Sequence, residues 1–210
     1  WDAFIAEHAE TDWFIYEMLC AWKRVLKRVD LSARSLFALI EPGSCFAGTL
    51  IDLTLACDLS YMLDHTDHPV SVHLSDLNRG QLPMSNGLTL IETRILVSPD
   101  TLAAALAHEG PWDAQAAEEA GVVTISPDDI DWEDEVRIAI EERASLSPDA
   151  LTGMEANLRF AGPETLETKI FGRLSAWQNW IFQRPNAVGE LGALTLYGRP
   201  ERPVFNWSRT

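Results

Sequence analysis

The fold follows from one stretch of the chain, Ala38-Leu-Ile-Glu-Pro-Gly-Ser-Cys-Phe-Ala-Gly-Thr-Leu-Ile-Asp-Leu-Thr-Leu-Ala-Cys-Asp58. An apolar run of strand length, 35–40, stops at the turn formers Pro42 and Gly43, and the apolar residues of 46–57 then predict a short helix. A strand that enters a tight turn and then a helix directs backbone N–H groups toward one place, where they could polarise a carbonyl oxygen. A plain strand-to-helix connection packed with small residues is the other interpretation, and the pattern alone leaves both open.

The flanking segments extend this strand and helix into an α/β layer protein. Apolar residues recur every three or four positions through 11–29, with Thr11 or Asp12 at the start and basic residues at the end, so an amphipathic helix comes first. Short apolar runs predict further strands at 60–63, 70–74 and 122–125. Proline and glycine signals predict helices at 98–107, 111–121, 131–146, 148–160 and 163–182. We therefore expect an α/β core, 1–127, and a helical extension, 128–210, with an extended tail from 185.

Composition limits the partners and the compartment. The 210 residues are 47% apolar, enough for a buried core, and carry a net charge of −16. That charge repels phosphate backbones and anionic lipid, so nucleic acid and membrane are poor partners. No apolar run approaches the roughly 18 to 20 residues of a bilayer span, and the three cysteines suit packed, reduced thiols. We expect a soluble, cytoplasmic protein, and the first residue, which is not Met, suggests a piece of a longer polypeptide.

The stretch 38–58 resembles the second signature of the crotonase (enoyl-CoA hydratase/isomerase) superfamily. In that signature a glycine-rich turn precedes a helix that carries a carboxylate and ends in Ala-Cys-Asp. The resemblance implies a crotonase-like (ββα spiral) core that is partial, because its N-terminal strands are missing. It places Gly48, Thr49 and Leu50 in the three-glycine turn, with the N–H of Thr49 on the thioester oxygen, and Asp52 on the first catalytic carboxylate position. Two of the three glycines are replaced, so Leu50 is expected to crowd the oxyanion pocket.

The second carboxylate of the superfamily follows a strand, and Val72-His-Leu-Ser-Asp76-Leu-Asn-Arg-Gly80 matches that place. Two carboxylates that converge on one carbon can move protons, or aim a water, beside an enolate held by oxyanion donors. Aspartate is one methylene shorter than the usual glutamate at both positions, and a misplacement of about 1 Å can lower a rate on the order of a hundredfold. The alternative for Asp76 is a loop aspartate that caps its own turn.

Three later strings narrow the resemblance: Ser126-Pro-Asp-Asp-Ile-Asp-Trp, Leu151-Thr-Gly-Met-Glu-Ala-Asn-Leu-Arg-Phe-Ala-Gly-Pro-Glu-Thr and Ser175-Ala-Trp-Gln-Asn-Trp-Ile-Phe-Gln-Arg-Pro-Asn-Ala-Val-Gly189. They closely resemble the C-terminal part of the crotonase-superfamily lyases that act on 2,3-epoxybenzoyl-CoA. The resemblance implies ring opening with water and release of formate and a semialdehyde acyl-CoA in aerobic benzoate degradation. Coenzyme A enters as part of the acyl-CoA substrate, and no separate cofactor is implied.

Those lyases are longer and carry an earlier crotonase-like half, with the better-formed glycine turn and paired glutamates, which this sequence lacks. Asp52 and Asp76 are therefore only counterpart positions in a second copy. Two hypotheses follow: the chain is the C-terminal part of a ring-cleaving lyase, or it is a non-catalytic half that supports the active half. Either way, its partner is the missing N-terminal half, and the 210-residue chain alone is expected to be inactive.

Other residues suggest an oligomer and no metal site. The apolar stripe of Ile170, Phe171, Leu174, Trp177 and Ile181 predicts an interface, and so a homo-oligomer. His65, His68 and His73 have loosely metal-like spacing, but solvated loop histidines are the more frequent case, so we expect no metal. Cys45 at a helix start could be a nucleophile, yet no histidine is near in sequence and a packed thiol is the simpler interpretation.

Overall fold

A computed structural model of the chain describes residues 1–159, 161–162 and 164–209. They form two compact units. The first contains Trp1–Asp30 and Leu36–Val136, and the second contains Leu31–Ser35 and the residues from Arg137 onward. The boundary therefore falls inside α7 (Trp132–Ala144), nine residues beyond the predicted limit of the core at 127.

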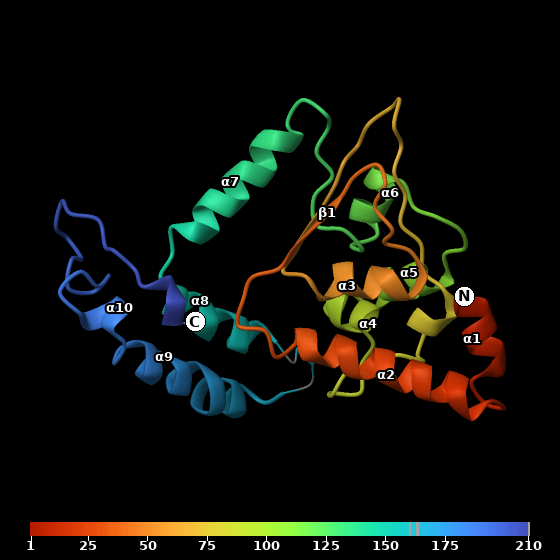
Figure 1. The fold of residues 1–210 in the computed structure, drawn as a ribbon, viewed down its shortest axis with the longest axis horizontal. Helices are drawn as coiled ribbons and strands as arrows, with labels where there is room; N and C mark the ends of the chain where they lie inside the picture. The colour runs from red at the N-terminus through yellow and green to blue at the C-terminus, as the bar shows by residue number, and fades with distance from the viewer. Residues whose placement is uncertain (160, 163, 210) are drawn as a thin grey trace. The chain divides into compact units, whose positions relative to one another are not determined.

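The first unit is an α/β structure built on a short parallel pair of strands (Figure 1). Strands β1 (Phe37–Ile40) and β2 (Leu59–Met62) pair with Phe37 opposite Leu59. The helical elements of this unit are α1 (Asp2–His8), α2 (Trp13–Val29), η1 (Gly48–Leu50), α3 (Ile51–Ala56), η2 (Asp76–Asn78), α4 (Leu90–Arg94), α5 (Pro99–Ala107) and α6 (Ala114–Glu119). Helix α3 connects the two strands and contacts α2, α4 and β1.

The start of α2 confirms the predicted amphipathic helix. Asp12 is the cap, and its Oδ1 accepts hydrogen bonds from the N–H groups of Phe14 at 2.8 Å and Ile15 at 3.3 Å. One face of the helix buries Ile15, Leu19 and Leu26. The predicted strands 35–40 and 60–63 and the helix 98–107 are also present, as β1, β2 and α5.

Two predicted strands are wrong, because each segment forms only isolated bridges in place of a regular ladder. In 122–125, the N–H of Ile125 donates to the Ser60 carbonyl at 3.1 Å and the N–H of Met62 donates to the Ile125 carbonyl at 3.0 Å, which makes one bridge, Tyr61 to Ile125. At the preceding residue, the N–H of Ser60 donates to the side chain, Thr124 Oγ1, at 3.0 Å. In 70–74, Val72 bridges Trp112 and the next residue, His73, bridges Ala47. Each of these pairings is a single isolated bridge, so neither extends into a ladder.

The predicted helix 46–57 starts later than expected. Gly48 has φ +58°, in the left-handed region, so the chain leaves its extended path there and enters the single 3₁₀ turn η1 before α3. Helix α4, which the sequence analysis left unassigned, is set by a local capping pair: the N–H of Glu92 donates to Thr89 Oγ1 at 3.3 Å, and the N–H of Thr89 donates to Glu92 Oε2 at 2.6 Å.

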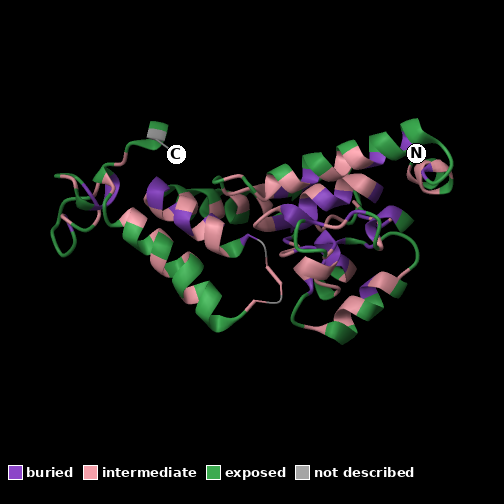
Figure 2. Ribbon diagram, turned by 90° about the horizontal axis from the view of Figure 1, so that it is seen from below, coloured by how far each residue is buried: buried purple, intermediate pink, exposed green. Residues whose placement is uncertain are grey.

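An apolar core fills the first unit. Its buried members come from nearly every element and include Leu26, Ile40, Ile51, Met62, Val72, Leu77, Ile91 and Val122. Figure 2 shows buried positions crowded through the helices and strands of this unit. Burial of about 1.5–3 kcal/mol per large apolar side chain makes this cluster the main source of the unit's stability.

The second unit is helical. It contains the C-terminal part of α7, α8 (Pro148–Leu158), the π-helix η3 (Thr168–Leu174), α9 (Ser175–Ile181), α10 (Pro185–Val188) and the 3₁₀ turn η4 (Trp207–Arg209). The predicted single helix 163–182 is thus a π-helix followed by an α-helix, and its first residue, like the last of 148–160, lies outside the described residues. The extended tail needs correction. Asn186 is buried and its amide exchanges hydrogen bonds with the backbone of Asn206, at 2.9 and 3.3 Å, which folds the tail back on α10.

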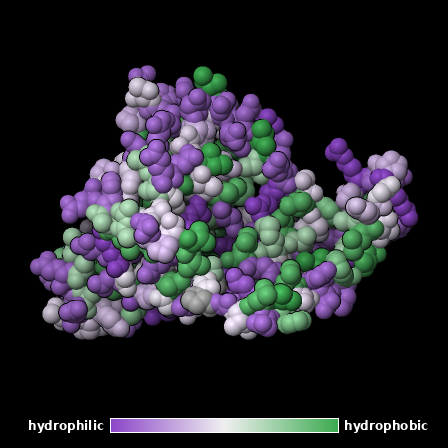
Figure 3. Space-filling model, turned by 180° about the vertical axis from the view of Figure 1, so that it is seen from behind, coloured by the Kyte–Doolittle hydropathy of each residue, from purple (hydrophilic) through white to green (hydrophobic). Residues whose placement is uncertain are grey.

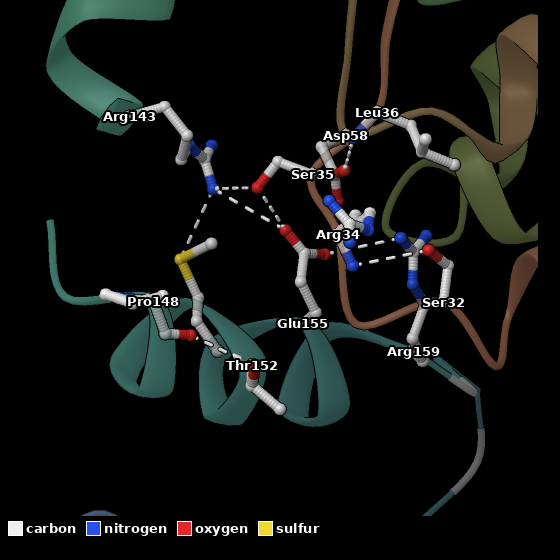
Figure 4. A network of polar contacts seen from close by, with 11 residues as sticks. Ser32, Arg34, Ser35, Leu36, Asp58, Arg143, Pro148, Thr152, Glu155 and Arg159 are labelled. Carbon is white, nitrogen blue, oxygen red and sulfur yellow. Dashed lines mark hydrogen bonds and ion pairs between the residues drawn. The ribbon is translucent and has the colours of Figure 1, made fainter. Parts of the chain in front are cut away.

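A buried ionic network organises the second unit around Glu155 of α8 (Figure 4). The Glu155 side chain is 0% exposed. Its Oε1 accepts a hydrogen bond from Ser35 Oγ at 2.6 Å and lies 3.7 Å from the guanidinium of Arg143, while its Oε2 lies 3.3 Å from that of Arg159. Asp149, six residues earlier on α8, is also buried and pairs with Arg184 at 3.2 Å. These pairs hold α7, the 31–35 segment, α8 and the chain before α10 together.

The apolar stripe of the second unit is divided between interior and surface. Trp177 and Ile181 pack on α8, where a Cβ on Gly153 would lie 2.6 Å from Ile181 Cδ1 and 3.6 Å from Trp177 Cβ. Phe171 and Leu174 are exposed, at 73% and 54%. The back face of the molecule mixes apolar and polar areas (Figure 3). Within the described ranges, no helix is both long and apolar enough to cross a membrane.

Candidate active site at the Gly48 and Thr49 turn

The predicted oxyanion turn opens on a cavity of about 590 Å³ in the first unit. Two of the predicted site residues, Gly48 and Asp76, line it, as do residues of α1 and of the loop at Glu109. Thr49 and Asp52 belong to the same strand-turn-helix but are not among the lining residues. The structure therefore brings half of the predicted site to one cavity.

The N–H of Thr49, expected to bind a thioester oxygen, already has an acceptor. It donates to Asp2 Oδ2 at 2.7 Å, and Thr49 Oγ1 donates to Asp2 Oδ1 at 3.3 Å. A third donor, Ser75 Oγ, reaches Asp2 Oδ2 at 2.7 Å. A carboxylate of the chain itself thus occupies the position at which an acyl oxygen would be polarised.

The neighbouring amides of the turn are also engaged. The N–H of Gly48 donates to the carbonyl of His73 at 2.8 Å, and the N–H of Leu50 donates to the carbonyl of Ala47 at 3.2 Å. Each backbone donor from Gly48 to Leu50 therefore has a protein acceptor. An acyl oxygen could reach the Thr49 N–H only if Asp2 moved away.

Asp52 lies behind the turn, in the first turn of α3, and is 2% exposed. Burial raises the pKa of Asp52 to about 7, the charge of Asp2 adds to this rise, and the Asn78 amide opposes it. Asn78 is close enough to have this effect, yet Asp52 Oδ2 and Asn78 Nδ2 are both buried without a hydrogen bond of standard geometry. A carboxyl with such a pKa can exchange a proton near neutral pH, although it does not line the cavity.

Asp76 has the opposite environment. It is exposed, in the first turn of η2, and faces the cavity. The other charged side chains of the lining are Asp2, Glu109 and Arg79, and the Arg79 guanidinium donates to the carbonyls of Leu106 and His108. Three carboxylates against one engaged cation make the cavity acidic, which disfavours a ligand that carries phosphates.

The remaining candidates show no catalytic arrangement. His65 Nδ1 accepts hydrogen bonds from the backbone N–H groups of Asp67 and His68, at 3.1 and 3.2 Å, so it closes its own loop. Among the described residues no three His, Cys, Asp or Glu side chains gather as a metal site would require. All three cysteines are free, and Cys45 is exposed rather than packed as expected.

Asp2, Ser75 and Asn78 are the site residues that sequence reasoning missed. The N–H of Ser75 donates to Asn78 Oδ1 at 2.7 Å, which caps the start of η2. The spacing Ser75-Asp-Leu-Asn78 resembles a helix-capping pair and could have indicated this contact. Nothing local connects Asp2 with Thr49, since the two lie far apart in sequence.

Solved structures with the same fold are enoyl-CoA hydratases and their relatives. The chain matches an enoyl-CoA hydratase from Bacillus anthracis with a TM-score of 0.67 and 16% identity, covering 96% of this chain and 74% of that one. It matches an enoyl-CoA hydratase/isomerase from Cupriavidus metallidurans with a TM-score of 0.68 and 18% identity, covering 91% and 68%. These matches establish the predicted crotonase-like α/β fold.

A sequence match is much stronger and more specific. The chain is 57% identical, over 199 residues and 94% of its length, to benzoyl-CoA-dihydrodiol lyase from Aromatoleum evansii. The chain is a crotonase-fold homologue of part of this lyase. It spans 36% of the length of the lyase. No protein-family model matches the sequence.

Proposed function

We propose that this crotonase-fold chain is the C-terminal part of a CoA-thioester lyase that opens the ring of 2,3-epoxybenzoyl-CoA with water, releasing formate and a semialdehyde acyl-CoA in aerobic benzoate degradation. The observation that carries the proposal is the 57% identity over 94% of the chain to benzoyl-CoA-dihydrodiol lyase. The chain spans 36% of that lyase, and the proposal places the other crotonase-like half in the remaining length. A cytoplasmic location, where CoA thioesters are metabolised, belongs to the same proposal.

A second candidate is that this region is a supporting half that does no chemistry itself. The contact that favours it is the 2.7 Å hydrogen bond from the Thr49 N–H to Asp2, because loss of one oxyanion donor typically lowers a rate by about 10² to 10³. The acidic lining of Asp2, Asp76 and Glu109 points the same way, since it disfavours the phosphates of coenzyme A.

Formate release from 2,3-epoxybenzoyl-CoA tests both candidates. The natural polypeptide that contains this sequence, its length fixed by mass spectrometry, should release formate, and no release would end the lyase proposal. Within it, Asp52→Asn and Asp76→Asn should keep activity close to that of Asp100→Asn if this region only supports the active half; Asp100 is exposed, as Asp76 is, and lies outside the predicted site. A loss of about a hundredfold or more in either variant would instead place the reaction in this copy.

The proposal includes a homo-oligomer formed through the exposed part of the apolar stripe. Phe171 and Leu174 are the residues to replace, because Trp177 and Ile181 pack within the second unit. Phe171→Ser with Leu174→Ser should lower the assembly state in sedimentation, with little change in stability. An unchanged assembly would remove this face from the interface.

A further inference from the structure

The carboxylate of Asp2 is held like a bound ligand. It accepts from one backbone N–H and two hydroxyls: Thr49 N and Ser75 Oγ on Oδ2, each at 2.7 Å, and Thr49 Oγ1 on Oδ1 at 3.3 Å. The donors come from η1 and from the residue before η2, far from Asp2 in sequence. Hydrogen bonds to a charged carboxylate are about twice as strong as neutral ones, so this contact is a specific one.

Gly48 fits the same carboxylate. A Cβ added at Gly48 would lie 2.3 Å from Asp2 Oδ2 and 3.0 Å from Asp2 Cγ. The glycine therefore does two things: it adopts φ +58°, and it leaves room for the carboxylate beside the Thr49 N–H. This explains the one glycine of the turn without any bound acyl group.

This contact joins helix α1 to the Gly48–Thr49 turn. Asp2 is in its first turn, and the helix contacts η2 and α2. We infer that the Gly48–Thr49 turn and Ser75 form a carboxylate-binding cradle, that its occupant is the chain's own Asp2, and that α1 thereby closes the Thr49 N–H to acyl ligands. The inference does not rest on the proposed function, because it concerns a contact within the chain.

Hydrogen exchange in the full polypeptide measures the cradle directly. Asp2→Ala should speed exchange about tenfold to hundredfold in peptides that cover Thr49 and α1, because a charge-assisted contact is lost. Glu10→Ala removes an exposed carboxylate from the segment between α1 and α2 and should leave hydrogen exchange in both peptides unchanged. Unchanged exchange at Thr49 and α1 in Asp2→Ala would overturn the inference.

Addition of acetate or of an acyl-CoA tests whether Asp2 occupies the cradle. Acetate, compared with chloride at the same ionic strength, should slow exchange at Thr49 in Asp2→Ala and leave the parent unchanged. An equal effect of acetate in the parent would show that Asp2 does not occupy the cradle. Benzoyl-CoA should leave Thr49 and α1 of the parent unchanged, whereas faster exchange in α1 on its addition would show that a thioester displaces Asp2, and would overturn the closure.

A double-mutant cycle separates this contact from a general loosening of α1. Gly48→Ala introduces both backbone strain at positive φ and the clash with Asp2, but only the clash disappears when Asp2 is absent. Gly48→Ala should therefore lower the urea midpoint less in Asp2→Ala than in the parent. Equal losses in the two backgrounds would contradict the inference.

Discussion

The two units of the chain are stabilised differently. The first has a large apolar core, whereas the described part of the second buries few apolar side chains, among them Leu151, Ala187 and Leu196, beside the charged Asp149, Glu155 and Arg159. Apolar burial is non-directional and spreads over many contacts, so single residues matter moderately. A buried ion pair concentrates stability in a few groups, because removal of one partner leaves an uncompensated charge. Replacement of one buried charged residue should therefore lower the stability of the second unit more than one replacement lowers that of the first.

Each unit also contains a buried carboxylate, and their surroundings differ. Glu155 has Ser35, Arg143 and Arg159 around it, while Asp52 faces Asn78 and the negative charge of Asp2. Two guanidinium groups lie beside Glu155, whereas burial raises the pKa of Asp52 to about 7 and the charge of Asp2 adds to the rise. Three substitutions test this contrast.

The largest effect is expected for Glu155→Ala. The change removes the buried carboxylate that pairs with Arg143 and Arg159, which should lower the free energy of unfolding by about 3–5 kcal/mol. Hydrogen exchange should accelerate in α8 and α9, with β1 and β2 little affected. If protection falls equally in both units, their stabilities are not separable and the contrast fails.

A smaller, pH-dependent effect is expected at Asp52. Because its pKa rises from 3.8 unfolded to about 7 folded, the folded state binds the extra proton. The stability that this proton gives the folded state is fully present below about pH 4 and is lost as the pH rises through 7. Between these limits the free energy of unfolding should change by at most about 4 kcal/mol.

Asp52→Asn should remove this slope between pH 4 and 7 in urea unfolding. The exposed Asp76→Asn serves as its control and should keep the slope of the parent. Parallel curves for the parent and Asp52→Asn would show that Asp52 titrates normally.

The smallest effect is expected for an exposed pair of the second unit. Arg137 and Glu141 are 3.1 Å apart, one turn from each other on α7, and both side chains are more than half exposed. Glu141→Gln should lower the free energy of unfolding by only about 0.3–0.5 kcal/mol. A loss comparable with that of Glu155→Ala in the same urea titration would mean that burial does not set the strength of these pairs.

The sequence by itself determined the local elements and the fold class. Caps, periodicity and turn residues predicted α2, β1, β2, α5 and α8, because each signal acts within a few residues of the element it controls. The same signals failed at 122–125, where pairing with the distant β2 stops after one bridge and the Ser60 N–H bonds to the Thr124 hydroxyl. The sequence also predicted the crotonase-like turn, and the structure places its Gly48 in the lining of a cavity.

Only the tertiary structure decided what that turn binds. Asp2 meets Thr49 and Ser75, and Ser35 meets Glu155, through contacts between segments that have no shared local pattern. The burial that raises the pKa of Asp52 likewise depends on how α3 packs in the core. The same short sequence in a helix packed elsewhere would not bury this side chain. Local signals select conformations of short segments, whereas the acceptor of a given N–H depends on which distant side chain the packed core brings within 3 Å of it.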